Sequence, residues 1–152
     1  MRPSRAVLLG GAVAGTCDIL AAFAVAWPRV APARVLQYIA SGVLGAAAFD
    51  GGSATAALGL LLHFGIALGA AAVYYLVSRA WPLLARRPLP CGLAYGVVVY
   101  LVMQSIVLPL SRVGVRRGSW SSIAVMIGIH MVCVGLPIAL AASLATRKPD
   151  VP

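Results

Sequence analysis

The sequence predicts an all-α membrane protein: four transmembrane helices in a bundle, with a short interfacial or re-entrant helix after the first span. Hydrophobic residues make up 62% of the 152 residues and charged residues only 10%, whereas soluble domains are about 45–50% apolar and about 25% charged. Several apolar runs are long enough to cross a bilayer, and the twelve Lys and Arg residues gather at their ends. We therefore expect residues 1–152 to form a single integral membrane domain.

The first span is predicted over residues 6–27, where Pro28 ends the apolar run and Trp27 suits the membrane interface. Two arginines before this run also resemble the start of a signal peptide. The run is longer than the core of a usual signal peptide and carries an acid in its middle, so we expect a retained helix. The other spans are predicted over 53–78, 91–110 and 120–145.

The segment 33–49 is helical in pattern but short for a span, and its polar side chains cluster on one side. Such an amphipathic helix is typical of a membrane interface or a re-entrant segment. Asp50, followed by two glycines, is expected to end it as a turn residue.

Four spans place both termini on one side of the membrane. The side of the termini carries seven cations: Arg2, Arg5, Arg79, Arg86, Arg87, Arg147 and Lys148. The other side carries five: Arg29, Arg34, Arg112, Arg116 and Arg117. The excess of positive charge on the cytoplasmic side of most membrane proteins favours cytoplasmic termini.

The net charge of +9 does not indicate a nucleic-acid partner, because the cations flank apolar runs and no polar face presents a basic patch. The lipid bilayer, with its anionic headgroups, is the expected partner. Each span also carries a pair of small residues four positions apart, which permits close helix packing: Gly11/Gly15, Gly65/Gly69, Gly92/Gly96 and Ala124/Gly128. Gly65 and Gly69 point away from His63, which leaves a face for a homo-oligomer or a larger membrane complex.

Three ionisable residues are predicted to share one depth in the membrane. Counted from the boundary opposite the termini, Asp18 lies nine residues before Trp27, His63 ten after Ser53, and His130 ten after Trp120. At ~1.5 Å per residue each lies about 13–15 Å deep, near the middle of a ~30 Å hydrocarbon core. An acid at a helix centre costs about 2.5–3.5 kcal/mol and normally finds a partner inside the bundle.

Other polar residues are predicted around this candidate site. Tyr74 shares a helix face with His63, and Cys133 shares one with His130 and Pro137, whose missing N–H leaves the carbonyl of Cys133 available. On the third span, Tyr100 and Gln104 form a polar side. Three further residues are expected to cover the mouth of the site above Asp18: Arg34, Gln37 and Asp50.

Four interpretations of Asp18, His63 and His130 remain open: a structural hydrogen-bond cluster, a proton or ion relay, a haem or metal site with His63 and His130 as ligands, or three residues that do not meet. No catalytic residue is assigned, because no serine lies in a nucleophile-elbow context and no second carboxylate accompanies Asp18. The expected function is transport, or the handling of protons or other ions. The alternatives are a non-catalytic subunit or assembly partner of a membrane complex, and a cofactor-binding electron carrier.

Several segments resemble an uncharacterised family of small bacterial inner-membrane proteins with four spans. They are 15–19 (GTCDI), 34–42 (RVLQYIASG), 58–64 (LGLLLHF), 74–75 (YY), 107–111 (VLPLS) and 130–137, which runs from His130-Met131 to Gly135-Leu136-Pro137. The order of a histidine, a tyrosine, a Pro-Leu pair and a second histidine is more distantly similar to a larger inner-membrane family of unknown function. The first resemblance implies an inner-membrane location and four helices, and it implies no activity.

Overall fold

The computed structural model describes residues 2–113 and 118–146, and all regular structure in these ranges is helical. Four helical segments are long and apolar enough to cross a membrane: Pro3–Ala26, Gly52–Ala80, Pro88–Leu110 and Trp120–Thr146. The prediction of an all-α chain with four such segments is confirmed, and each predicted end lies within three residues of the observed one. The four segments indicate an integral membrane protein.

The first span, α1 (Pro3–Ala26), crosses behind the others and packs against α3 (Gly52–Ala80). Its close approach to α3 depends on two glycines on one face. A Cβ atom on Gly11 would lie 2.9 Å from the Cα atom of Leu68, and one on Gly15 would lie 2.8 Å from the ring of Phe64. Small residues therefore set the separation of these two helices, as is common between helices in lipid.

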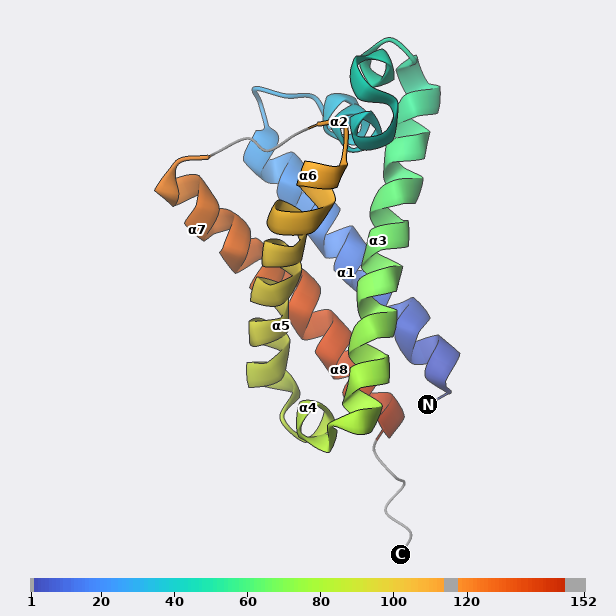
Figure 1. Cartoon of the computed structure of the whole chain (residues 1–152), viewed down its shortest axis with the longest axis vertical. Helices are drawn as coiled ribbons and strands as arrows, with labels where there is room; N and C mark the ends of the chain where they lie inside the picture. The colour runs from blue at the N-terminus through green and yellow to red at the C-terminus, as the bar shows by residue number, and fades with distance from the viewer. Residues whose placement is uncertain (1, 114–117, 147–152) are drawn as a thin grey trace, which may run out of the picture.

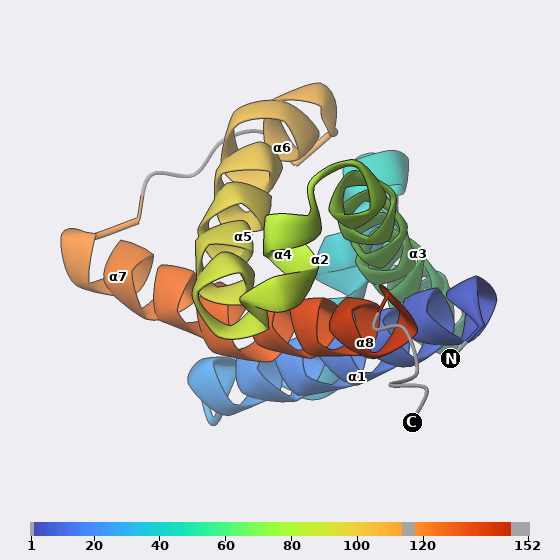
Figure 2. The ribbon, with the colours of Figure 1, turned by 90° about the horizontal axis from the view of Figure 1, so that it is seen from below.

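The predicted short helix over 33–49 consists of α2 (Pro32–Leu44) followed by a 3-10 helix, η1 (Gly45–Phe49). Gly45 permits the change of direction between them with a φ of 66°. α2 lies across the end of the structure that is opposite the start of α1 and the end of α8 (Figures 1 and 2). It packs mainly on the first half of α3, where an added Cβ on Gly59 would clash with the carbonyl of Leu36.

The third and fourth spans are each interrupted by a π-helical segment. The third contains α5 (Pro88–Val102), η2 (Met103–Val107) and α6 (Leu108–Leu110), and the fourth contains α7 (Trp120–Ile129), η3 (His130–Gly135) and α8 (Leu136–Thr146). Each π segment is followed by a Leu-Pro pair, which ends in Pro109 or Pro137. Proline has no N–H and its ring crowds the preceding turn, so a wider turn before it relieves the conflict.

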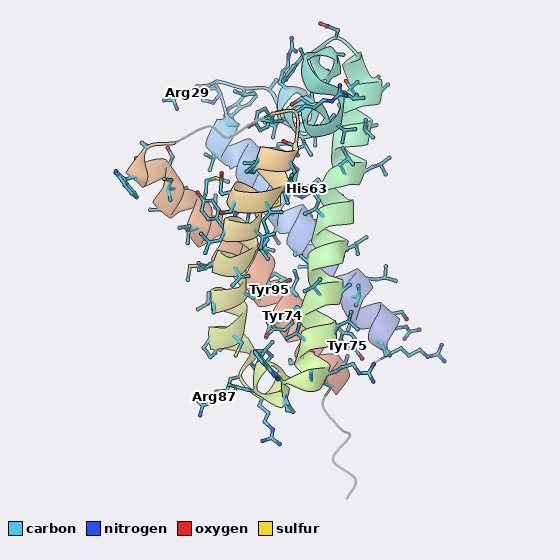
Figure 3. All side chains as sticks on the ribbon, in the orientation of Figure 1. Arg29, His63, Tyr74, Tyr75, Arg87 and Tyr95 are labelled. Carbon is cyan, nitrogen blue, oxygen red and sulfur yellow. The ribbon has the colours of Figure 1, made fainter. Side chains whose placement is uncertain are left out.

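The four spans pack in the spatial order α3, α1, α8 with η3, α5. α3 and α5 share little backbone contact, although they lie on the same side of α1 and α8 (Figure 2). The lower part of the space between them is filled by Tyr74 and Tyr95, whose ring centroids are 4.8 Å apart. The Tyr95 hydroxyl donates to the carbonyl of Ala70 at 2.7 Å. These side chains hold α5 against α3 below the level of His63 (Figure 3).

Candidate functional site

A cavity of about 100 Å³ lies above these two tyrosines, and Asp18, His63 and His130 all line it. Its other lining residues are almost entirely apolar and come from α1, α2, α3, α5, η2 and η3. The volume corresponds to a few water molecules at ~30 Å³ each. The structure therefore brings the three ionisable residues of the predicted site to one small internal space.

His63 is fixed to the first span through one ring nitrogen. Its Nε2 atom lies 2.8 Å from the carbonyl oxygen of Gly15. A carbonyl oxygen can only accept, so Nε2 carries the proton of this bond and Nδ1 is the unprotonated nitrogen of the neutral ring. The edge of the neighbouring Phe64 ring packs against the imidazole, with centroids 5.5 Å apart. His63 is thus a half-buried side chain with one nitrogen engaged and one available.

His130 begins the π segment η3 and is held in the opposite tautomer. Its Nδ1 atom lies 2.9 Å from the carbonyl oxygen of Met126 on its own helix, so Nε2 is the unprotonated nitrogen of the neutral ring. The ring of Tyr100 meets the imidazole edge-on at 5.5 Å. The backbone at His130 lies directly against Gly96, where an added Cβ atom would clash. α5 therefore fixes the position of this histidine from the other side of the cavity.

Asp18 is half-buried one turn after Gly15. Within residues 2–113 and 118–146 its carboxylate forms no ion pair and accepts no hydrogen bond from protein. The described part of the chain contains one other acid, Asp50, which is exposed beyond the end of η1. The cavity thus combines one carboxylate without a protein donor and two imidazoles that each retain a proton-accepting nitrogen.

The other residues predicted around the site are placed in different ways. Tyr100 is buried and contacts His130, and Gln104 and Cys133 are half-buried in η2 and η3 without lining the cavity. Tyr74 lies away from it, because its hydroxyl donates to the carbonyl of Leu84 at 3.2 Å. A shared helix face does not bring Tyr74 to His63, since eleven residues separate them by about 16 Å along the axis.

None of the three residues predicted at the mouth lines the cavity, and α2 contributes Ile39 to its wall. Gln37 is buried and donates to the carbonyl of Gly52 at 3.0 Å, which ties α2 to the start of α3. Arg34 donates to the carbonyl of Phe49 at 3.1 Å and stacks over its ring. Asp50 is exposed. α2 therefore contributes an apolar side chain to the cavity wall.

The donor geometry gives little support to a metal or haem site. No group of three His, Cys, Asp or Glu side chains in the described ranges is arranged to hold a metal ion. A volume of about 100 Å³ is also well below the ~300–1,000 Å³ of small-molecule and cofactor pockets. The three cysteines are free and unpaired in the described structure.

Sequence reasoning did not identify Ile39, Val99 and Met103 as lining residues. Their apolar side chains carry no signal that separates a cavity wall from ordinary packing. The carbonyl of Gly15 was also missed as the partner of His63. Every residue has a backbone carbonyl, so the sequence does not show which one accepts a side-chain hydrogen bond.

Comparisons of the chain with protein-family models, curated proteins and solved structures find no match.

Proposed function

We propose that this protein moves protons across a membrane through the cavity shared by Asp18, His63 and His130. The observation that carries the proposal is that three ionisable side chains from three spans line one cavity of about 100 Å³. Ionisable residues inside a membrane segment are costly and commonly mark proton or ion pathways. The space accommodates a few water molecules, which would connect groups that do not bond directly.

The hydrogen bonds of the two histidines support a relay more than a purely structural cluster. Each imidazole uses one nitrogen on a backbone carbonyl and keeps the other unprotonated in the neutral ring. A structural cluster would instead pair Asp18 with a ring N–H, and both ring N–H groups are engaged elsewhere. Asp18 and the two free nitrogens are therefore three sites at which a proton can be held.

Proton flux into vesicles tests the proposal. The purified protein is reconstituted with an entrapped pH-sensitive dye, and a potassium diffusion potential drives protons inward. We expect the wild type to acidify the lumen faster than empty vesicles, and Asp18→Asn to fall to the empty-vesicle rate. Asp50→Asn is the matched control, because it removes an exposed acid outside the cavity. A wild-type rate equal to that of empty vesicles, or an unchanged rate in Asp18→Asn, would contradict the proposal.

A second candidate function is supported by glycines that face outward. Added Cβ atoms on Gly65, Gly69 and Gly128 would meet none of the described residues within 4 Å, so α3 and α7 present small-residue faces that the described part of the chain leaves open. Such faces permit close packing of a second helix. They support a role as a homo-oligomer or as a subunit of a membrane complex. Cross-linking in native membranes that returns only the monomer would contradict this candidate.

For the location we propose a bacterial inner membrane with both termini in the cytoplasm. α1 begins and α8 ends at the same end of the structure (Figure 1). That end carries five of the described cations: Arg2, Arg5, Arg79, Arg86 and Arg87. Accessibility of a cysteine placed at Arg87 or Arg29, which lie at opposite ends (Figure 3), to a membrane-impermeant reagent checks the orientation.

A further inference from the structure

A second pocket lies at the end of the structure where α1 begins and α8 ends, far from the cavity of Asp18. It has a volume of about 730 Å³ and is formed by the last turn of α3, by α4 (Pro82–Arg86) and by the end of α8. Arg79 and Arg86 line it, together with Tyr75, Ser78 and Thr146. Its lining is therefore basic and hydroxylic, in contrast to the apolar lining of the inner cavity.

The two arginines are carried on elements that are held in place. Pro82 starts α4 immediately after α3, and Leu84 packs against the buried core. The hydroxyl of Tyr74 donates to the carbonyl of Leu84 at 3.2 Å, and α4 also contacts α8. The pocket wall is consequently preformed, so only the long arginine side chains need to be ordered when a ligand binds.

The charge of the pocket is not neutralised by the residues that the structure describes. Neither Arg79 nor Arg86 forms an ion pair or donates a hydrogen bond to a described residue. The two acids in the described ranges are elsewhere: Asp18 lies in the inner cavity and Asp50 beyond the opposite end of α3. Two guanidinium groups at one pocket, with no carboxylate beside them among the described residues, make a site for an anion, and their planar donors match phosphate oxygens.

The position of the pocket favours a lipid headgroup over free phosphate as its ligand. Trp81 separates α3 from α4 and is 67% exposed, and tryptophan at the end of a span is typical of the headgroup level of a bilayer. Basic pockets between transmembrane helices at this level bind lipid headgroups. We propose that the pocket between α3, α4 and α8 binds the phosphate headgroup of an anionic phospholipid through Arg79 and Arg86.

Lipid retention measured by native mass spectrometry tests this assignment. The full chain in neutral detergent is titrated with phosphatidylglycerol, with phosphatidylcholine and with inorganic phosphate, and thermal melting is followed in parallel. We expect phosphatidylglycerol to be retained and to raise the melting temperature. Arg79→Gln and Arg86→Gln should each weaken retention about fivefold or more. The matched control is Arg87→Gln, which removes a neighbouring cation that does not line the pocket.

Several outcomes would overturn the assignment. Equal losses in Arg86→Gln and Arg87→Gln would show that diffuse positive charge, and no defined pocket, attracts the lipid. Equal retention of phosphatidylcholine would exclude recognition of an anion. Stabilisation by inorganic phosphate alone, with no further effect of the lipid, would identify a soluble ligand. If a glutamine variant does not fold, Arg86→Lys replaces it, and we expect weaker retention there because the paired guanidinium donors are lost.

Discussion

The Nε2 atom of His63 lies 2.8 Å from the carbonyl oxygen of Gly15, one turn of α1 before Asp18. This bond joins the first and second spans at the level of the cavity. Asp18 contributes no comparable protein bond within the described ranges. The two residues therefore have separable roles, with His63 contributing to stability as well as to the cavity and Asp18 contributing to the cavity alone.

Replacement of His63 by leucine should lower the stability of the fold. The substitution keeps a large apolar volume and removes the bond to Gly15, and hydrogen bonds between membrane helices contribute on the order of 1 kcal/mol. We expect a fall of about this size in the free energy of unfolding, measured by titration with SDS in mixed micelles. An unchanged unfolding midpoint would contradict a stabilising role for this bond.

Asp18→Asn should leave the stability almost unchanged while it abolishes proton flux. The variant keeps the shape of the side chain and breaks no protein hydrogen bond among the described residues, so we expect a change within about 0.5 kcal/mol. The same SDS titration measures it, beside the flux assay on the same preparation. A large loss of stability would indicate that the carboxylate holds the helices together.

Valine at Gly11 should destabilise the packing of α1 on α3. Its first side-chain carbon would lie 2.9 Å from the Cα atom of Leu68, and overpacking of this kind costs about 1–3 kcal/mol. Gly69→Val is the matched control on α3, because no described residue lies within 4 Å of an added Cβ atom there. Equal melting temperatures for the two variants in detergent would show that α1 and α3 do not approach as described.

Tyr95→Phe should weaken the contact between α3 and α5. The variant retains the ring that packs on Tyr74 and removes the 2.7 Å bond to the carbonyl of Ala70, so we expect a loss of about 1 kcal/mol. Hydrogen exchange of the α5 backbone should become faster. Tyr38→Phe serves as the control, since Tyr38 is exposed on α2; an equal effect of the two substitutions would count against the bridge.

The sequence was sufficient to predict the four spans because apolar runs bounded by arginine, tryptophan and proline are local signals. Rise per residue converts sequence distance into height and predicts one depth for Asp18, His63 and His130, and the structure places all three at one cavity. Gln37 and Arg34 could not be assigned in this way. Arg34 donates to the carbonyl of Phe49 at the end of η1, and Gln37 donates to the carbonyl of Gly52 at the start of α3. The path of the chain between these two residues depends on packing between distant segments.

The π segments in the third and fourth spans also could not be predicted from the sequence. Pro109 and Pro137 predict a disturbed turn, but the sequence does not say whether the helix kinks, breaks or widens. The structure shows widened turns that begin at Met103 and at His130. The turn at His130 also lies against Gly96 of α5, where an added Cβ atom would clash, and such packing between helices cannot be read from the sequence around one proline.

The cavity also has a consequence for the order of biosynthesis. Asp18 belongs to α1, whereas His63 and His130 belong to helices that the ribosome makes after it. When α1 enters the bilayer, no other wall of the cavity exists, and the acid must be accommodated at a cost of about 2.5–3.5 kcal/mol by the apolar residues around it. The long hydrophobic run of α1 is therefore a requirement of insertion as well as of the finished structure.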